Sequence, residues 1–276
     1  MATKEYFLPT SLSEALSLLA EHGPALLVMA GGTLAMPLIN EGVSVPEKVM
    51  GLRRAGLDRV HQDDGVLVVG ATTPLTRLLD GSTIPMLAEA ARHIGGWQIR
   101  NMGTAGGNLF APPPAGDLAV ALLALDARVK LADHRRQRVL PLTDFYTGYL
   151  TTALEAGELV TEIHVPVPRG KTAYLKYGRK HANTPAIVTV AAHLVVDGKR
   201  VKDARIGLNG VGPHPLRARQ AEATLIGATL DEQAIANAAS AAAAECDPFT
   251  DAIASDWYRR EMVNVFVRRA LTHIAA

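Results

Sequence analysis

The stretch NMGTAGGNLFAPPPAGD, residues 101–117, differs in composition from a core element and from an ordinary surface loop. It contains four glycines and three consecutive prolines, and Asn108 directly follows the pair Gly106-Gly107. A Gly-Gly pair lets backbone N–H groups converge on an anion, because no Cβ blocks the approach. The stretch is therefore either an anion-binding loop or a plain turn, and one loop alone does not separate the two interpretations.

A second glycine loop in the sequence favours the interpretation as an anion-binding loop. Ala30-Gly31-Gly32-Thr33 directly follows the apolar run 25–29, which we predict to be a buried strand. Two such loops can hold a diphosphate from two sides, and Thr33, Thr104 and Asn108 add short polar side chains that can donate to its oxygens. Neither loop fits G-x-G-x-x-G or G-x-x-x-x-G-K-[ST], so a Rossmann dinucleotide site and a Walker loop are not supported.

Composition and charge narrow the class of protein. The 276 residues suit two domains or one large one, and 48% hydrophobic residues allow a sizeable core. A net charge of +1 without blocks of like charge argues against nucleic-acid and membrane-surface partners. The one cysteine, Cys246, excludes an internal disulfide and a cysteine-ligated iron–sulfur cluster held by this chain alone, and we interpret it as a packing residue. Because there is no signal-peptide pattern and no apolar run of about 20 residues, we expect a cytoplasmic protein without a membrane span.

The pattern up to about residue 168 predicts alternating strands and short helices. Ser11-Leu12-Ser13-Glu14 has the spacing of a capping box and would start a helix that ends at Gly23. Asp117 stands where the N-cap of a later helix would be. The remaining predictions are helices over 85–94 and 118–125, strands over 66–69 and 158–167, and a hairpin of 127–131 with 138–142.

The chain changes character near 167–171, and we divide it into domains 1–168 and 169–276. Residues 173–211 have the pattern of antiparallel strands, with Asp197-Gly198 as a two-residue hairpin turn. The predicted class is therefore α+β, with both glycine loops in the first domain.

The end of the chain has a helical pattern. From Pro215 onward we expect helices, with Thr229 and Glu232 forming a second capping box and Ser255 capping a last helix over 256–274. The second domain should therefore combine an antiparallel sheet with a bundle of helices.

No catalytic or metal-binding motif is apparent in the sequence. The nine histidines are scattered without an H-E-x-x-H pair, and no G-x-S-x-G is present. We assign no catalytic residue and no metal ligand. One group of basic residues is either a solvated strand pair or lies near a bound ligand and a redox partner: Arg169, Lys171, Lys176, Arg179, Lys180 and His181.

Both glycine loops with their flanks resemble the FAD-binding subunits of the molybdenum hydroxylases. That family includes the medium subunit of aerobic carbon monoxide dehydrogenase and the flavin domain of xanthine dehydrogenase. It shares its FAD-binding fold with p-cresol methylhydroxylase and vanillyl-alcohol oxidase. The family patterns I-R-N-x-G-T-I-G-G-N and A-G-G-T-D are similar to IRNMGTAGGN (99–108) and AGGTL (30–34) here. The similarity continues through AGDLAVALLALDA (115–127) and ELVTEIHVP (158–166) and spans nearly the whole chain.

The resemblance implies an FAD-binding domain of two α/β subdomains, followed by a C-terminal domain with a three-stranded antiparallel sheet and a helical bundle. The two loops would wrap the FAD diphosphate, and Asp117 would contact the polar chain of the cofactor. Val160 would contact the flavin ring through its backbone, and Lys176 would lie near the polar edge of the ring, where a positive charge favours the reduced, anionic flavin. The implied cofactor-binding residues are Met29, Ala30, Gly31, Gly32, Thr33, Leu34, Ala35, Gly103, Thr104, Gly106, Gly107, Asn108, Asp117, Val160 and Lys176.

Several of these residues keep a second interpretation. Asp117 is also a helix N-cap, and Lys176 is equally compatible with a solvated strand lysine. Leu34 stands where many family members have a polar residue, so one hydrogen bond to the cofactor is in doubt. Phe110 either touches the isoalloxazine or packs as an ordinary aromatic, and the prolines 112–114 either shape the loop or a contact with a partner subunit.

The family resemblance also implies partners and a reaction. A large subunit with a molybdenum–pterin cofactor would oxidise the substrate, and a small subunit with two [2Fe-2S] clusters would carry electrons to FAD on this chain. From FAD they would pass to an external acceptor, and the complex would be a heterotrimer paired into a dimer of heterotrimers. The substrate and the acceptor are not encoded here, because the substrate site lies on another polypeptide.

Two other functions stay open at this point. The first is a free-standing FAD-dependent oxidoreductase of the same superfamily, which would need a general acid or base beside the flavin. The second is a cofactor-free scaffold subunit that keeps the fold alone. The departures from the family pattern at Leu34 and in the second loop keep this function open. A bound flavin separates the scaffold from the other two functions.

Overall fold

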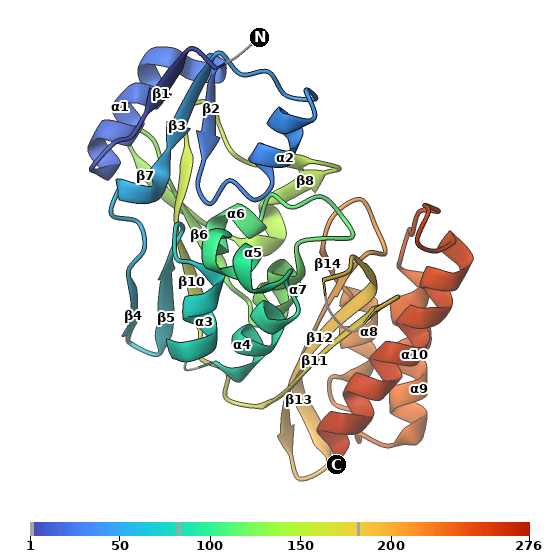
Figure 1. Cartoon of the computed structure of the whole chain (residues 1–276). Helices are drawn as coiled ribbons and strands as arrows, with labels where there is room; N and C mark the ends of the chain where they lie inside the picture. The colour runs from blue at the N-terminus through green and yellow to red at the C-terminus, as the bar shows by residue number, and fades with distance from the viewer. Residues whose placement is uncertain (1–2, 82–83, 181–182) are drawn as a thin grey trace.

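The structure is a computed structural model of the chain and describes residues 3–81, 84–180 and 183–276 (Figure 1). The described residues form three main sheets, two in the first part of the chain and one in the second. Helices at the end of the chain cover one side of the third sheet, as Figure 1 shows in orange and red. The predicted α+β class is confirmed.

The first sheet has the order β1-β3-β2, and both strand pairs are parallel. Ser11 caps the first helix as predicted, with Oγ accepting the N–H of Glu14 at 3.2 Å. The carboxylate of Glu14 reaches back to the N–H of Thr10 at 2.7 Å, one residue before the expected Ser11. The elements of this part are β1 (Glu5–Phe7), α1 (Leu12–His22), a 3₁₀ turn (Gly23–Ala25), β2 (Leu26–Met29), α2 (Ala35–Asn40) and β3 (Lys48–Gly51).

The prediction that the strand before the first glycine loop is buried is wrong for most of its length. Leu26 is buried, but the rest of β2 is only half-buried. Val28 and Met29 border a cavity, so this strand serves as a wall and not as core.

The second sheet is antiparallel, with the order β4-β5-β10-β6-β7. Its strands are β4 (Val60–Asp63), β5 (Val66–Gly70), β6 (Arg128–Ala132), β7 (Gln137–Pro141) and β10 (Leu159–Pro166). The helices beside it are α3 (Leu75–Gly81), α4 (Pro85–Arg92), α5 (Trp97–Met102), α6 (Ala105–Asn108) and α7 (Asp117–Ala124). Smaller pieces are the 3₁₀ turns Leu52–Arg54 and Leu142–Asp144 and the hairpin of β8 (Tyr146–Gly148) with β9 (Thr151–Thr152).

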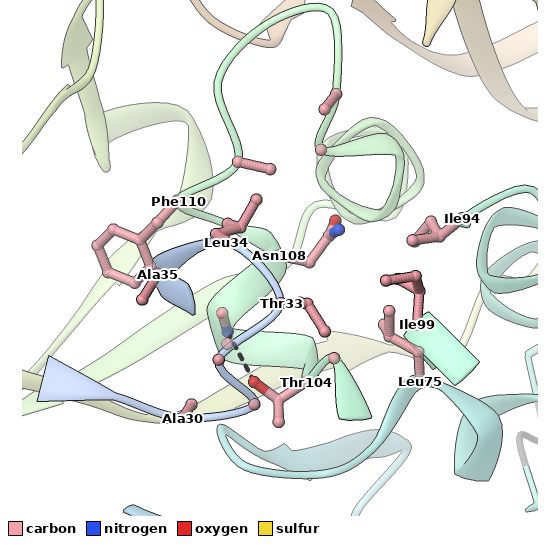
Figure 2. A pocket seen from close by; sticks show the side chains of 18 of the residues that line it. Ala30, Thr33, Leu34, Ala35, Leu75, Ile94, Ile99, Thr104, Asn108 and Phe110 are labelled. Atoms are coloured by element: carbon pink, nitrogen blue, oxygen red, sulfur yellow. Dashed lines mark hydrogen bonds between the residues drawn. The ribbon is translucent and has the colours of Figure 1, made fainter. Parts of the chain in front are cut away.

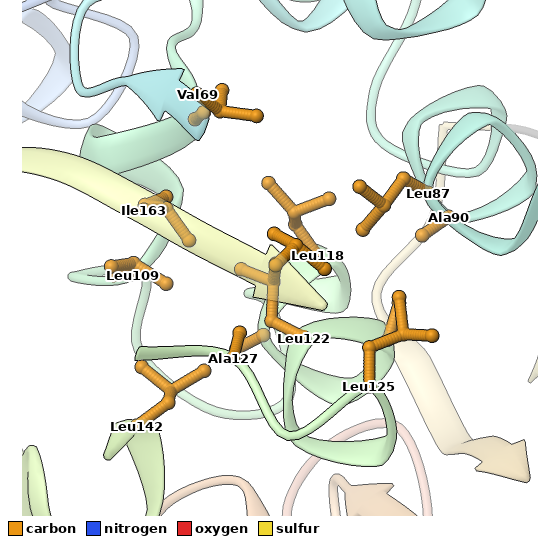
Figure 3. Packing of buried hydrophobic residues seen from close by; sticks show 14 of the residues in the cluster. Val69, Leu87, Ala90, Leu109, Leu118, Leu122, Leu125, Ala127, Leu142 and Ile163 are labelled. Atoms are coloured by element: carbon orange, nitrogen blue, oxygen red, sulfur yellow. The ribbon is translucent and has the colours of Figure 1, made fainter. Parts of the chain in front are cut away.

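Helix α7 is the centre of the first core, and every one of its residues is buried. Figure 3 shows Leu118, Leu122 and Leu125 packing toward Ile163 and Leu87. A helix that is apolar on all sides is stable only when it is enclosed. Here α7 is enclosed by α4 and by strands β12 and β13 of the C-terminal sheet, and its side chains share a core with the second sheet.

The start of α7 corrects one prediction. Gly116 is the N-cap, with φ 85°, and Asp117 is the first helical residue. The carboxylate of Asp117 is therefore not used as a cap. It is bonded to Lys176 and Thr189 of the C-terminal sheet instead.

The third sheet has three long antiparallel strands, as predicted, and a two-residue fourth strand at its edge. Asp197 pairs with Arg200, so the hairpin turn is Gly198-Lys199, one residue later than predicted. Gly198 takes φ 59°, which a two-residue turn of this kind requires. The strands are β11 (Lys171–Gly178), β12 (Ala186–Asp197), β13 (Arg200–Asn209) and β14 (Leu216–Arg217).

Three helices close the C-terminal domain: α8 (Arg219–Leu225), α9 (Glu232–Ala244) and α10 (Asp256–Ala275). Ser255 caps α10 as predicted, accepting the N–H of Tyr258. The Thr229 capping box is wrong, because Asp231 directly precedes α9 and accepts the N–H of Ala234 at 2.9 Å. Cys246 is buried, which confirms its packing interpretation, and burial raises the pKa of its thiol to about 12.

The chain passes from the second sheet to the third between Pro166, where β10 ends, and Lys171, where β11 begins. The domain limits 1–168 and 169–276 remain a prediction that this change supports. In the described part of the chain, no helix has the length and apolar character needed to cross a membrane.

Candidate cofactor site

One cavity of about 510 Å³ lies where the two glycine loops meet. Figure 2 shows it from close by, with Ala30, Thr33, Leu34 and Ala35 of the first loop on one side and Thr104 and Asn108 of the second loop nearby. Strand β10 and the first residue of α7 also line it, and β11 contributes Lys176. Every residue that the family resemblance implied for cofactor binding borders this one cavity.

The first loop offers free backbone donors. The N–H groups of Gly32, Thr33 and Leu34 have no hydrogen-bond partner among the described residues. Gly32 has φ 76°, a conformation that side-chain-bearing residues rarely adopt. A Cβ on Gly31 would lie 1.9 Å from the carbonyl oxygen of Met102, so the two loops are packed against each other here. Three free N–H groups in succession suit an anion.

The second loop differs from the expectation that its backbone N–H groups hold the anion. The N–H groups of Ala105 and Gly106 bond to the carbonyls of Thr73 and Ala71 at 2.9 Å each. The N–H of Gly107 donates to the hydroxyl of Thr104 at 3.1 Å, the dashed line in Figure 2. These donors attach the short helix α6 to the turn after β5 and cap its first turn, so they are not free.

The second loop can donate hydrogen bonds to a ligand through two of its side chains. The hydroxyl of Thr104 accepts from Gly107, which leaves its own O–H free to donate. The side-chain oxygen of Asn108 accepts the N–H of Leu118 at 3.1 Å and leaves the amide NH₂ without a partner among the described residues. Two polar side chains thus border the same cavity as the three free N–H groups.

Asp117 and Lys176 form a buried ion pair at the edge of the cavity, with 2.8 Å between Nζ and Oδ2. Burial raises the pKa of Asp117, and the hydrogen bonds from Lys176 and Thr189 oppose that rise. The Lys176 side chain is 7% exposed and also donates to the carbonyl of His93 at 2.9 Å. The alternative of a solvated strand lysine is therefore wrong, and Asp117 is the charged partner of Lys176.

Of the described residues in the basic group, Lys176 borders the cavity and the other four do not. Lys171 donates to the carbonyl of Ile274, and Arg169, Arg179 and Lys180 are exposed. His181 lies outside the described residues.

The packing interpretation of Phe110 is confirmed, and its contact with the isoalloxazine stays a prediction. Its ring lies edge-on against Phe145, with 5.8 Å between centroids, and it also borders the cavity. Leu34 lies at the rim and is 39% exposed. Its side chain adds no hydrogen bond, but its free backbone N–H can donate to an anion.

Sequence reasoning missed the apolar walls of the cavity. Leu75 and Ile99 border it in Figure 2, and Leu154, Leu159 and Pro185 complete the wall. An apolar residue in a wall has the same sequence pattern as one in a core, so no motif identifies it. Thr72 also borders the cavity, but its Oγ1 is buried without a partner and is shielded from it.

This combination of groups fits FAD. The free N–H groups and polar side chains suit the diphosphate, and the apolar walls suit the two ring systems of a dinucleotide. The titratable side chains that line the cavity in the described part of the chain are Asp117, Glu158 and Lys176, and all three are in ion pairs.

Comparison with known proteins agrees with this fit. Residues 2–168 match a family described as the FAD binding domain in molybdopterin dehydrogenase. The chain belongs to this FAD-binding family. Residues 173–274 match the CO dehydrogenase flavoprotein C-terminal domain, so the flavoprotein type extends over both parts of the chain.

Relatives of this flavoprotein cover its whole length. The glyceraldehyde dehydrogenase medium chain of Sulfolobus acidocaldarius is 34% identical, over 98% of each chain. The carbon monoxide dehydrogenase medium chain of Afipia carboxidovorans is 32% identical, over 99% of this chain and 96% of the relative. A crystal structure of the Cu,Mo-CO dehydrogenase has a chain that matches with a TM-score of 0.94 at 31% identity, over 100% of this chain and 99% of that one. The chain is thus a flavoprotein subunit of the molybdenum hydroxylase type, with FAD as its cofactor.

Proposed function

We propose that this chain holds FAD in the cavity between its two glycine loops and carries electrons through it. The observation that carries the proposal is the meeting of three unpartnered N–H groups, at Gly32 to Leu34, with the free donors of Thr104 and Asn108. FAD supplies the redox chemistry. The residues of this chain bind and orient it and exclude water from one side of the site.

The assignment of cofactor parts to residues belongs to the same proposal. The first loop would hold the diphosphate from one side, and Thr104 and Asn108 would hold it from the other. The backbone of Val160 and the pair of Asp117 with Lys176 would border the flavin. Because Asp117 balances the charge of Lys176, we expect a smaller stabilisation of anionic flavin than a free lysine would give.

The partners are proposed from the relatives. Those relatives are named as medium chains, or as a subunit of the 6-hydroxypseudooxynicotine dehydrogenase complex. We propose a small [2Fe-2S] subunit that delivers electrons, a large molybdenum–pterin subunit that holds the substrate, and a dimer of heterotrimers as the complex. Electrons would leave FAD for an external acceptor. We propose the cytoplasm as the compartment, because the single cysteine of the chain is free and buried.

A free-standing oxidoreductase finds no support at the cavity. Such an enzyme would need a free general acid or base beside the flavin. Among the described lining residues, Glu158 is bonded to Arg138 and Asp117 to Lys176. The hydrogen bond from Arg138 lowers the pKa of Glu158, so this carboxyl is a poor proton carrier near neutral pH.

The loop assignment is tested by one substitution and a matched control. A Cβ on Gly107 would lie 2.8 Å from the Thr104 hydroxyl, and a Cβ on Gly148 would lie 2.9 Å from the Thr151 hydroxyl. Gly148 is in the β8 hairpin and does not border the cavity. We expect Gly107→Val to abolish FAD binding, because the valine displaces the Thr104 hydroxyl and enters the cavity.

Gly148→Val should bind FAD as the wild type does, although its local clash is the same. Fluorescence titration of the apo chains with FAD measures both. The assignment is refuted if Gly107→Val binds FAD with unchanged affinity.

A further inference from the structure

Three polar side chains form one row across the C-terminal sheet. Lys176 of β11 is the register partner of Thr189 on β12, and Thr189 is the register partner of Asn209 on β13. Register partners place their side chains on the same face of a sheet. Neighbours of Thr189 on the strand, Val188 and Val190, belong to the core on the opposite face, beneath the helices. We call Lys176, Thr189 and Asn209 the polar row.

The whole polar row bonds to one short segment of the FAD-binding domain, residues 114–117. The side-chain amide of Asn209 donates to the carbonyls of Pro114 and Ala115, at 3.3 Å and 2.7 Å. Thr189 and Lys176 donate to the two carboxylate oxygens of Asp117, at 3.0 Å and 2.8 Å. The row thus holds both ends of the segment.

That segment is a wall of the cofactor cavity. Ala115, Gly116 and Asp117 border the cavity, and α7 begins at Asp117. The carbonyls of Pro114 and Ala115 have no donor from the FAD-binding domain in the described residues, so Asn209 is what fixes them. Asn209 is fully buried and does not border the cavity.

We infer that Asn209, with the polar row, is a positioning residue for the cofactor: the C-terminal domain sets the cavity wall without touching the bound FAD at this residue. The inference rests on the proposed FAD site. It gives the C-terminal sheet a role in cofactor retention, because a wall that moves lowers the affinity of a preorganised site.

The test compares two neighbouring substitutions on β13 in the full-length chain. Asn209→Asp keeps the shape of the side chain but turns a donor into a carboxylate that faces two carbonyl oxygens. Leu208→Ala is the control, because Leu208 lies in the core on the opposite face and does not reach the segment. Both variants lower the stability of the C-terminal domain, so a difference between them reports on the segment.

Two readouts are measured for each variant. The first is hydrogen exchange of the Ala115, Leu118 and Ala119 amides in the FAD-free chain, which bond to Pro112, Asn108 and Gly116. We expect exchange about tenfold faster in Asn209→Asp and unchanged in Leu208→Ala. The second is FAD affinity with the visible spectrum of the bound flavin. We expect a Kd raised about tenfold and an altered band shape in Asn209→Asp only.

The inference is overturned if Asn209→Asp keeps wild-type exchange and affinity, or if Leu208→Ala changes both readouts equally. If neither the wild-type chain nor its complex with the partner subunits binds FAD, the proposed function fails, while the exchange experiment still tests the polar row. If Asn209→Asp does not fold, Thr189→Val removes one bond to Asp117 and is measured in the same way.

Discussion

Glu158 shows how one residue at the cavity is held in its charged state. Its side chain is 1% exposed, and both carboxylate oxygens accept from Arg138 at 2.7 Å. The hydrogen bond from Arg138 lowers the pKa of Glu158 below its usual value of 4.5. A carboxyl with a lowered pKa stabilises the fold above its unfolded-state pKa, and this contribution is lost as the pH falls through the folded-state pKa.

Replacing Arg138 should therefore give a pH-dependent loss of stability. We expect Arg138→Met to lower the free energy of unfolding by about 2 kcal/mol at pH 7, since the buried Glu158 carboxylate then keeps only the N–H of Glu155 as a donor. The difference from wild type should narrow as the pH falls below 4.5. Denaturant unfolding at several pH values measures it.

Arg136→Met is the matched control, because Arg136 pairs with Glu155 and both side chains are more than half exposed. Its effect should stay within about 0.5 kcal/mol at every pH. Equal effects of the two substitutions would show that the buried Arg138–Glu158 pair stabilises the fold no more than the exposed Arg136–Glu155 pair does.

At the scale of residues, the sequence predicted which residues line the cavity better than it predicted their hydrogen bonds. The glycines, Thr104, Asn108 and Lys176 were predicted at the site, and all of them border the cavity. That the second loop uses its N–H groups internally could not be predicted, because the acceptors on Ala71 and Thr73 come from a turn about 30 residues earlier. Lys176 was ambiguous for the same reason, since its partner Asp117 lies 59 residues away.

At the scale of elements, helix α7 connects the second loop to the core. The side-chain oxygen of Asn108 accepts the N–H of Leu118 in the first turn of α7, and its amide NH₂ is free to donate to a ligand. One side chain therefore has a structural role and a binding role on different atoms, and substitution can separate them.

Asn108→Asp should keep the structural role and lose the binding role. The carboxylate still accepts from Leu118 and suits a helix N-terminus, so stability should stay within about 0.5 kcal/mol of wild type. FAD affinity should fall about tenfold or more, because a donor to the diphosphate becomes a negative charge. Thermal unfolding and FAD titration measure the two effects.

Asn108→Ala is the companion variant, and it should lose about 1 kcal/mol of stability as well as affinity. Wild-type affinity in Asn108→Asp would remove Asn108 from the cofactor site.

The main elements were predictable from local pattern, but their ends and the short strands were not. Residues 85–94 and 138–142 were predicted within two residues of α4 and β7. The caps at Asp117 and Thr229 were wrong, because a competing residue was better placed: Gly116 in the first case and Asp231 in the second. Strand β3 was missed, since four residues become a strand only by pairing with β1 and β2.

At the scale of the whole molecule, the two parts of the chain build the site together. The FAD-binding domain supplies the glycine loops, while β11, β12 and β13 bond to the segment before α7. Family resemblance predicted both parts and their order, and the matches to 2–168 and 173–274 confirm the family. The polar row was beyond sequence reasoning, because Lys176, Thr189 and Asn209 become neighbours only through strand register.

The central claim is that this cavity retains FAD, and one measurement tests it directly. The purified chain, alone and co-expressed with its partner subunits, is incubated with FAD and desalted. Its absorbance spectrum is recorded, and the flavin released by heat is identified by chromatography. We predict a flavin spectrum and released FAD from the complex, with weaker retention by the lone chain. Absence of flavin from both samples, or release of FMN in place of FAD, would contradict the two-loop site.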